Sequence, residues 1–384
     1  MMVLYDQSGL AAGNLALTPA AFAIVTLMNG QNTLGDIVAE FLQQFRQPLP
    51  GERLLELLHQ LDRRGMLDGP VFDARYERLV EDYRQLPARP TQAVTSGADL
   101  EELRSELCDM VGEGTATTEG QRVVGLVAPH LDYERGRCCY AEAYAQLRGQ
   151  DDIDRFVIVG TNHFGRSGTV AWTVKDYDTP FGPAETDRGF IDKLRGRIGV
   201  DLGVHELDHL HEHSVELQVV ILKALRGSRP VRIVPLLCPD VCGPTGLKPG
   251  DGSGPGADEF AAALAEVLAG EPGRSCVIAG ADLSHVGRRF GDDFDLDDEF
   301  LQAVEADDRA LLDLIEVGDA AGLLARLHGT RNLYRVCGAG SIYILLRALG
   351  GPNVRMLRYH QAVNRDEQIA VTCVAGLVVA DGAA

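Results

Sequence analysis

Histidine and aspartate side chains follow three apolar segments of this sequence, at the points where strands are expected to end. They are His130 after VVGLVAP, His163 three positions after VIVG, and Asp282 and His285 after VIAGA. Open α/β sheets bind ligands at the edge where the carboxyl ends of their strands meet. We therefore expect three strands to bring imidazole rings, which bind metals and carry protons, to the same edge.

Two further segments add donor groups to this set. One of them, HLHEHSVELQ, places imidazoles and carboxylates at an expected helix start: His209, His211, Glu212, His213 and Glu216. The other opens with Cys337 and continues as the apolar helix CGAGSIYILL, whose positive N-terminus is expected to lower the pKa of the thiol. Imidazole and thiolate ligands suit iron, copper and zinc, although the spacing alone does not fix a metal.

Each of these residues also has a purely structural interpretation. A single histidine after a strand is usually a satisfied loop or core residue, and an isolated cysteine such as Cys337 is usually an inert buried thiol. The carboxylates of EHSVE can simply stabilise a helix start, because His213 and Glu216 lie one turn apart. The convergence of several such groups on one sheet edge is what favours a functional site.

Other catalytic and binding motifs are weak or absent in the sequence. Cys238 and Cys242 form a CxxxC pair, but no second pair stands at the spacing of a zinc finger. No GxGxxG follows the first strand, and neither GxxxxGKS/T nor GxSxG occurs. Ser284 directly precedes His285, and adjacent residues do not generally align as a nucleophile and its base. These patterns disfavour a nucleotide loop and a serine hydrolase.

The expected elements explain how distant residues reach one edge. From residue 121 onward, near-continuous apolar strands alternate with helices, which predicts an α/β fold with a mixed sheet flanked by helices on both faces. The strand sequences are RVVGLVAP, RFVIVG, TVAWTV, VRIVPLLC, SCVIAGADL, VRMLRYHQAV and IAVTCVAGLVVA. The helices are expected around CCYAEAYAQLRG, HEHSVELQVVILKAL and ADEFAAALAEVLAG, and over roughly 295–328 and 338–349. The Gly- and Pro-rich stretch at 238–259 is expected to be a surface loop.

Residues 1–85 are predicted to be helical and to form a small separate domain. Its amphipathic stretches are TPAAFAIVTLMNG with Thr18 as N-cap, NTLGDIVAEFLQQF and ERLLELLHQLDRRG. This order fits a winged-helix module and fits a plain helical packing domain equally well. Residues 86–120 follow as a Pro-containing linker and a connecting helix, and residues 121–384 form the α/β domain.

The composition narrows the function classes. The chain has 384 residues, 45% of them hydrophobic, and a formal net charge of −20. It has no Lys/Arg-rich run and no basic face on the N-terminal helices, so neither nucleic acid nor a membrane is an expected partner. Eight cysteines are too sparse for a disulfide framework. Neither a signal peptide nor a membrane span is recognised, so we expect a cytoplasmic protein.

Five segments form a combination that is far more specific than any single motif. They are APHLDYERG (128–136), VIVGTNHFG (157–165), EHSVELQ (212–218), AGADLSHVG (279–287) and VCGAGSIYILL (336–346). In order and spacing they resemble the Memo family, also called AmmeMemoRadiSam system protein B, over roughly residues 120–380. The N-terminal segment resembles the PqqD-like peptide-binding domain found in one bacterial branch.

The resemblance implies a fold like that of the class III extradiol dioxygenases, which hold non-haem Fe(II) with two histidines and a carboxylate. In Memo-like proteins a cysteine replaces the carboxylate. Carried over position by position, the implied ligands are His130, His163 and Cys337. They are expected to hold one Fe(II) or Cu ion, with Zn as an alternative.

The resemblance also implies roles for residues around the ligands. His285 corresponds to the acid/base residue of the dioxygenases, and we expect it to act alongside His213 with a pKa near neutrality. Glu212 lies in the segment that lines the same pocket, and Asp282 is expected to orient a histidine. Four positions depart from the usual family pattern and leave the ligands intact: Leu131, Asp132, Phe164 and Ala339.

The main functional hypothesis is a metal-dependent, dioxygenase-like oxidoreductase that acts on an unknown small-molecule or peptide substrate. The alternatives are a non-catalytic module that binds a peptide or other ligand, and a metal-handling protein. Either alternative would act with a radical-SAM partner, and an AMMECR1-like protein is a second expected partner.

Overall fold

The computed structural model of the protein describes residues 2–6, 8–92, 99–243 and 254–380. The chain forms two compact units, Met1–Leu86 and Pro87–Ala384. Each unit has a hydrophobic core of its own.

In its described residues the first unit contains a two-stranded sheet and four helices. Its elements are β1 (Met2–Leu4), β2 (Leu15–Leu17), α1 (Pro19–Thr26), α2 (Leu34–Phe45), α3 (Gly51–Asp62) and α4 (Pro70–Gln85). Thr18 caps α1 as predicted, because its hydroxyl accepts the amide hydrogen of Ala21 at 3.2 Å. The expected apolar faces of α2 and α3 bury Ile37, Phe41 and Leu54 in the core.

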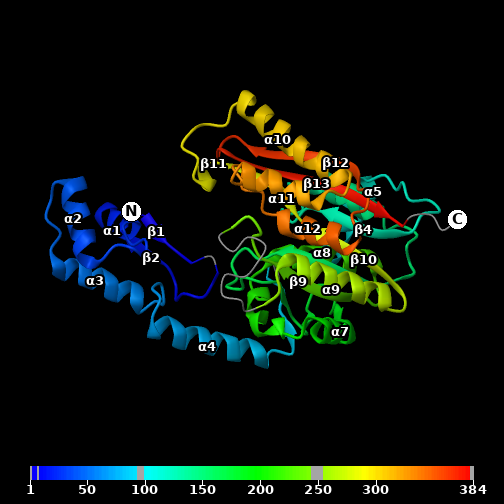
Figure 1. Cartoon of the computed structure of the whole chain (residues 1–384), viewed down its shortest axis with the longest axis horizontal. Helices are drawn as coiled ribbons and strands as arrows, with labels where there is room; N and C mark the ends of the chain where they lie inside the picture. The colour runs from blue at the N-terminus through cyan, green and yellow to red at the C-terminus, as the bar shows by residue number, and fades with distance from the viewer. Residues whose placement is uncertain (1, 7, 93–98, 244–253, 381–384) are drawn as a thin grey trace. The chain divides into compact units, whose positions relative to one another are not determined.

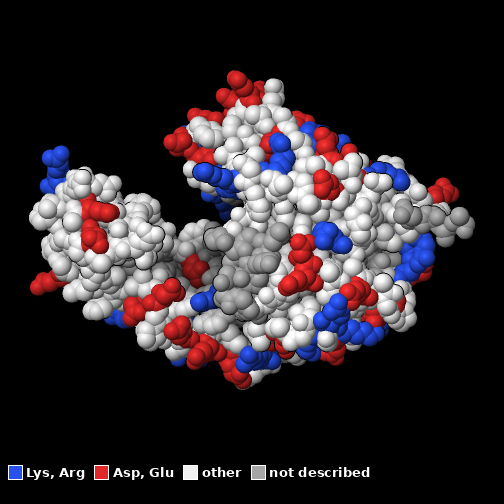
Figure 2. All heavy atoms as spheres, in the orientation of Figure 1, with Lys and Arg blue, Asp and Glu red and all other residues white. Residues whose placement is uncertain are grey.

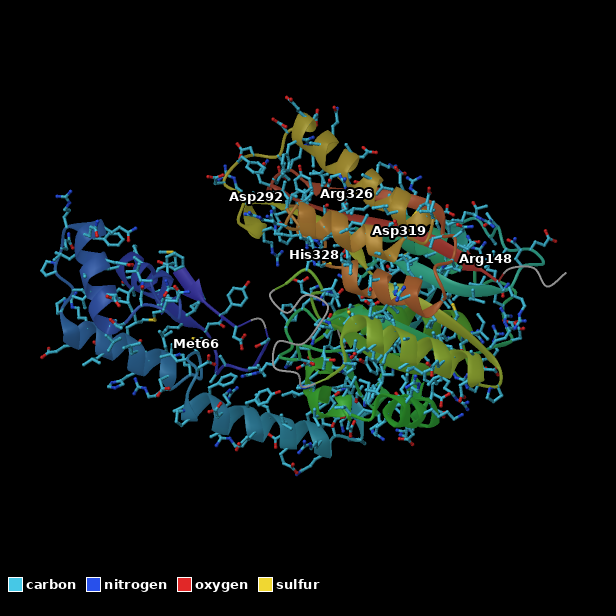
Figure 3. All side chains as sticks on the ribbon, in the orientation of Figure 1. Met66, Arg148, Asp292, Asp319, Arg326 and His328 are labelled. Atoms are coloured by element: carbon cyan, nitrogen blue, oxygen red, sulfur yellow. The ribbon has the colours of Figure 1, made fainter. Side chains whose placement is uncertain are left out.

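Parts of this unit escape prediction from the sequence. β1 and β2 pair antiparallel over three residues each, which is too short to show an alternating pattern. The sequence of α4 has no continuous apolar stripe, and the helix accordingly buries only Tyr83. The unit also has a pocket of about 740 Å³ with a mainly apolar lining that includes Leu58, Phe72 and Met66, the last of which is labelled in Figure 3.

A large mixed sheet forms the middle of the second unit (Figure 1). Among the described residues its order is β11-β13-β4-β10-β5-β9-β6, with β12 beside β13 and β8 beside β9; β3 and β7 form a separate pair. The strands are β3 (Ala88–Arg89), β4 (Val123–Ala128), β5 (Ile153–Thr161), β6 (Ala171–Trp172), β7 (Asp176–Tyr177), β8 (Glu185–Thr186), β9 (Arg232–Cys238), β10 (Arg274–Gly280), β11 (Asp282–Gly287), β12 (Arg355–Asn364) and β13 (Ile369–Val379). β4, β10, β5 and β9 run parallel to one another, so their carboxyl ends meet at one edge.

Helices cover both faces of this sheet, which confirms the predicted mixed α/β fold class. The helices are α5 (Leu100–Glu113), α6 (Arg137–Ala145), α7 (Arg188–Ile198), α8 (His213–Arg226), α9 (Ala257–Gly270), α10 (Asp298–Glu316), α11 (Ala320–Gly329) and α12 (Ala339–Ala348), with 3₁₀ turns η1 (Leu202–His209) and η2 (Arg288–Phe290). α5, α6 and α8 share one core with Leu126 and Ile158, whereas α7, α9, α11 and α12 share the other with Val127 and Val159. Successive strand residues therefore face opposite layers.

Three segments differ from the sequence-based expectation or fall outside it. The expected linker at 86–97 contains a strand, β3, and the buried residue Arg89; residues 93–98 lie outside the described residues. The sequence predicts a single strand, SCVIAGADL, whereas the structure has two here: Asp282 and His285 lie within the second, β11, which pairs with β13. Residues 244–253 of the expected loop also lie outside the description.

The charged side chains on the surface and the apolar content of the helices are as the composition of the sequence predicts. Figure 2 shows acidic and basic side chains interspersed over the visible face. Across the described ranges no helix has the length and apolar character needed to cross a bilayer.

The start of α8 packs unusually closely on the sheet. A Cβ atom at Gly160 in β5 would overlap the Ser214 hydroxyl and come within 2.8 Å of Val215. A Cβ at Gly280 in β10 would lie 2.8 Å from the Ser214 carbonyl oxygen. The absence of side chains at these two positions lets the first turn of α8 reach the carboxyl edge of the sheet.

Gly160→Ala is therefore expected to push α8 outward and to lower the free energy of unfolding by about 1–3 kcal/mol. Gly196→Ala is the matched control, because Gly196 lies in α7 with open space around it. In a helix interior alanine is more stable than glycine by about 1 kcal/mol, so this variant should be neutral or stabilising. Denaturant unfolding measures both values. Equal effects in the two variants would contradict the close packing inferred for α8.

Candidate metal centre

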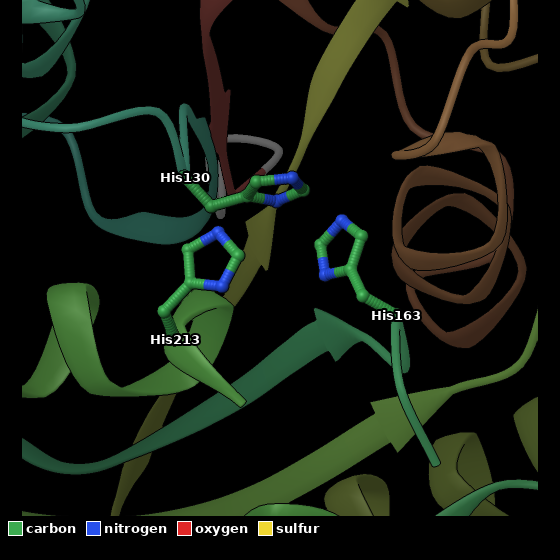
Figure 4. Close-up of side chains that lie close together, drawn as sticks. All are labelled: His130, His163 and His213. Carbon is green, nitrogen blue, oxygen red and sulfur yellow. The ribbon is translucent and has the colours of Figure 1, made fainter. Parts of the chain in front are cut away.

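Three imidazole rings meet beyond the carboxyl ends of the parallel strands. His130 follows β4, His163 follows β5, and His213 is the first residue of α8. One ring nitrogen of each lies within 4.8 Å of the others, and the ring centroids are 4.9, 5.6 and 5.1 Å apart. Figure 4 shows the rings arranged around a common space. Within the described residues, this is the one group of histidine, cysteine or acidic donors close enough to hold a metal ion.

Polar contacts at Nδ1 orient each ring: hydrogen bonds at His130 and His163, and a close approach to the Glu212 carboxylate at His213. The Nδ1 of His130 lies 2.9 Å from the Gly280 carbonyl oxygen, so it must carry the proton that it donates. The Nδ1 of His163 lies 3.1 Å from both carboxylate oxygens of Glu212, and that of His213 lies 3.3 Å from one of them. In the neutral form of each ring, Nε2 is then left with the lone pair, as in metal-ligating histidines.

Glu212 connects two of the rings to the start of α8. Its buried carboxylate also accepts the backbone amide hydrogens of His163 and Ser214, each at 2.9 Å. The bond from Ser214 makes Glu212 the N-cap of α8. One carboxylate therefore positions both the loop after β5 and the helix start that carries His213.

The charges of this cluster follow from burial and from Glu212. Burial lowers the pKa of His130 well below its usual value, and it also lowers the pKa of His213 against the opposing effect of Glu212. At His163 burial acts downward, but the Glu212 carboxylate outweighs it and raises the pKa. The pKa of Glu212 is lowered although burial alone would raise it, because His163 stabilises the anion. At neutral pH, His130 and His213 are therefore uncharged and able to bind a cation.

Cys337 lies beside this group. Its Sγ is 3.2 Å from the Nε2 of His130 and 4.0 Å from the Nε2 of His285. The expectation that a helix start lowers the pKa of this thiol is wrong. α12 begins at Ala339 with Gly338 as its cap, and burial raises the pKa of Cys337 well above its usual value. A metal bound by this sulfur would therefore have to displace a proton.

The loop before Cys337 is held in uncommon backbone conformations. Three of its residues have φ between 48° and 55°, in the left-handed region that non-glycine residues rarely adopt: Arg331, Asn332 and Arg335. Arg335 donates to the His285 carbonyl oxygen at 3.0 Å and pairs with Asp292, which is labelled in Figure 3. The sulfur is thus presented by a constrained loop, whereas two of the imidazoles follow strand ends.

Comparison with known proteins agrees with the resemblance found in the sequence. The family model described as "Memo-like protein" matches residues 95–377, which is most of the chain. The chain belongs to the Memo family. The matched segment contains every residue of the candidate site, whereas the first unit lies outside it.

Individual Memo relatives come from distant organisms. A MEMO1 family protein of Aquifex aeolicus is 25% identical over 295 residues, which cover 76% of this chain and 73% of the relative. One from Thermus thermophilus is 30% identical over 268 residues and covers 68% of this chain and 73% of the relative. One from Methanococcoides burtonii is 30% identical over 241 residues and covers 62% and 79%, respectively.

In this Memo protein, Asp282 and His285 border the cluster from β11. One Asp282 oxygen accepts the backbone amide hydrogen of His130 at 3.2 Å, and the other lies 3.6 Å from the His130 Nε2. Asp282 therefore contacts a site histidine, although the ring proton goes to Gly280. Burial raises the pKa of Asp282 to about 7. Burial lowers the pKa of His285 to about 4, so the expected near-neutral value is wrong and His285 is a neutral proton acceptor.

Other candidate residues in this Memo chain lie outside the group of three rings. His209 is fully buried, and its Nδ1 lies 2.7 Å from the Tyr177 hydroxyl, while His211 is exposed. The Ser284 hydroxyl donates to Asp308 at 2.7 Å inside the core, which excludes it as a free nucleophile. These contacts give His209 and Ser284, two residues that the sequence alone left open, structural roles.

His213 is the main addition that the structure makes to the predicted ligands. The sequence places it in the pocket as a catalytic residue, and the geometry groups it with His130 and His163. The EHSVE motif contained the signal, because it indicates a helix start with Glu212 as a candidate cap, and His213 is the first residue of that helix. Cys238 and Cys242 join no such group in the described parts of the chain, which removes support for a zinc site there.

Glu212→Gln is expected to lower the pKa of His163. The amide keeps the shape of the carboxylate but not its charge, so the main group that offsets the burial of the imidazolium is lost. An NMR pH titration of the ring resonances in metal-free protein measures this change. Glu206→Gln, which alters a carboxylate bonded to Thr173, should leave His163 unchanged. An unshifted His163 in Glu212→Gln would show that the two groups are not coupled.

Proposed function

We propose that this Memo protein holds one transition-metal ion at the carboxyl edge of its sheet and acts as a metal-dependent oxidoreductase. The observation that carries the proposal is the set of three imidazoles that lie close enough together to hold one ion, with each Nδ1 facing the Gly280 carbonyl or the Glu212 carboxylate. In the neutral rings this leaves Nε2 free to bind the ion. Imidazole ligands suit iron, copper and zinc. Fe(II) or Cu is the proposed native metal, because both support oxidation chemistry.

The donor groups fit a single ion. His130 and His163 belong both to the ligand set implied by family resemblance and to the geometric group. Bonds of about 2.0–2.3 Å to one ion place two ligand atoms roughly 3–4 Å apart. The 3.2 Å between the Cys337 sulfur and the His130 Nε2 is compatible with shared coordination, so Cys337 stays a proposed ligand beside His213.

The chain's own residues would hold the site and move protons. When bound, the metal would supply redox and Lewis-acid chemistry. Glu212 would keep the His163 and His213 rings in their binding orientation. His285, whose Nε2 lies 4.0 Å from the Cys337 sulfur, would accept a proton from a substrate group held beside the cluster.

The proposal extends to features that family resemblance implies. They are a fold relation to the class III extradiol dioxygenases, a PqqD-like first unit, a small-molecule or peptide substrate, a radical-SAM partner, an AMMECR1-like partner and a cytoplasmic location. The mainly apolar pocket of the first unit supports a ligand-binding role for that unit.

Purified protein is expected to bind one metal ion per chain, and His163→Ala is expected to lose most of this affinity. Removing a direct ligand should cost more than the ~10–100-fold that removal of an outer partner costs. Equilibrium dialysis with Zn(II), and anaerobically with Fe(II), followed by elemental analysis, measures the affinity. His59→Ala is the control, because His59 is exposed on α3. Equal metal content in these two variants would refute the site.

The third ligand is decided by comparing Cys337→Ala with His213→Ala in the same assay. Loss of a thiolate-to-metal charge-transfer band in Co(II)-loaded Cys337→Ala would establish the sulfur as a ligand. Unchanged metal content and spectrum in that variant would remove Cys337 from the site and leave the three histidines.

The oxidoreductase assignment predicts oxygen uptake by the Fe(II)-loaded protein with phenolic test substrates. His285→Gln should keep the metal but lose most of the rate, because the proton acceptor is gone; general-base removal typically costs about 10²–10⁴-fold. An oxygen electrode measures the uptake. Metal binding without uptake, for any phenol tested, would favour the binding and metal-handling alternatives.

A further inference from the structure

The segment at the start of the second unit is held by strand pairing and by a buried side chain. Ala88 and Arg89 form β3, which pairs in parallel with Asp176 and Tyr177 of β7, and the Arg89 carbonyl oxygen accepts the Asp178 amide hydrogen at 2.8 Å. The Arg89 side chain is completely buried. We call residues 88–92 the strap, because they lie against the start of α8 and form hydrogen bonds with it.

The buried Arg89 guanidinium divides its hydrogen bonds among three acceptors. Its Nε donates to the carbonyl oxygen of His209 at 2.9 Å, and its Nη2 donates to that of Glu212 at 2.8 Å. Its Nη1 forms an ion pair with the fully buried carboxylate of Glu216. That carboxylate also accepts the backbone amide hydrogen of Gln92, at 2.9 and 3.1 Å to its two oxygens.

All three acceptors belong to the short stretch that delivers part of the metal centre. His209 ends η1, Glu212 is the N-cap of α8, and Glu216 lies in the first turn of that helix. One rigid, planar cation therefore ties the approach to the helix, its cap and its first turn together. The backbone held in this way carries the Glu212 carboxylate and the His213 ring.

We propose that Arg89 is a positioning residue for the metal centre: through the strap, it sets the orientation of the Glu212 carboxylate and the His213 ring. The inference rests on the proposed metal site. Arg89 stands before residue 95, where the Memo match begins, and directly after the first unit. The geometry of the site thus depends on the segment of chain that connects the two units.

Arg89→Lys is the sharpest variant. Lysine keeps the positive charge beside Glu216, but it cannot reach three acceptors with the fixed geometry of a guanidinium. Arg155→Lys is the matched control, since Arg155 is also buried and also ion-paired, with Asp187 and Glu271, in the same unit. Both substitutions should lower the midpoint temperature of thermal unfolding. Only Arg89→Lys should also change the orientation of the Glu212 carboxylate and the His213 ring.

A double variant separates positioning from stability. Arg89→Met together with Glu216→Leu removes both charges, and replacement of a buried ion pair by apolar residues is often tolerated. The bonds to the carbonyl oxygens of His209 and Glu212 are lost in this variant as well. A positioning role therefore predicts a perturbed site even where the thermal midpoint is close to that of the wild type.

Two measurements read out the site. The first is the imidazole ¹⁵N spectrum of the metal-free full-length chain, in which Arg89→Lys and the double variant should shift the His163 and His213 resonances and Arg155→Lys should not. The second is Zn(II) affinity, which should fall by ~10–100-fold in the two Arg89 variants, as it does when other outer partners of metal ligands are removed.

The outcomes distinguish the inference from the function on which it rests. A wild-type chain that binds no Zn(II) or Fe(II) would defeat the proposed function, and the ring resonances of the metal-free chain would still decide the role of Arg89. The positioning role alone would be overturned by a different result. In that case the wild type binds metal, but the ring resonances and the Zn(II) affinity change no more in the two Arg89 variants than in Arg155→Lys.

Discussion

The candidate site depends on one buried negative charge. A carboxylate removed from water needs compensating partners, and Glu212 finds them in two backbone amides and two imidazoles. The same oxygens cap α8, so the helix start and the ring arrangement form together. This explains why the glycines at 160 and 280 matter: they let the capped end of the helix approach the strands closely enough for Glu212 to reach across.

The sheet edge and much of the site are readable from the sequence because they follow local rules. Continuous apolar segments identify strands buried on both faces, and parallel strands end on the same side. A polar residue directly after such a segment, as at His130, is therefore expected at that edge of the sheet. The same logic places His163, and the Memo motifs add Cys337, which lies close to His130 but outside the group of three rings.

The remaining features depend on packing between distant segments, which no local pattern encodes. The state of the Cys337 thiol is set by burial and not by the helix behind it. The low pKa of His285 has the same origin. Arg89 looks like part of a polar linker, and only the fold shows that it is fully buried under α8. Strands as short as β1 and β3 carry too few residues for a periodic signal.

The contrast between strand-borne rings and a loop-borne sulfur has a mechanical consequence. His130 and His163 follow strands of the sheet, and His213 begins a helix that packs closely on it. Cys337 follows a loop whose left-handed residues are held by contacts such as those of Arg335 with His285 and Asp292. Loss of one of these contacts would let the loop relax and carry the sulfur away from His130 without moving the rings. The position of the sulfur would thus depend on residues outside the site, whereas the positions of the rings depend on the sheet and on Glu212.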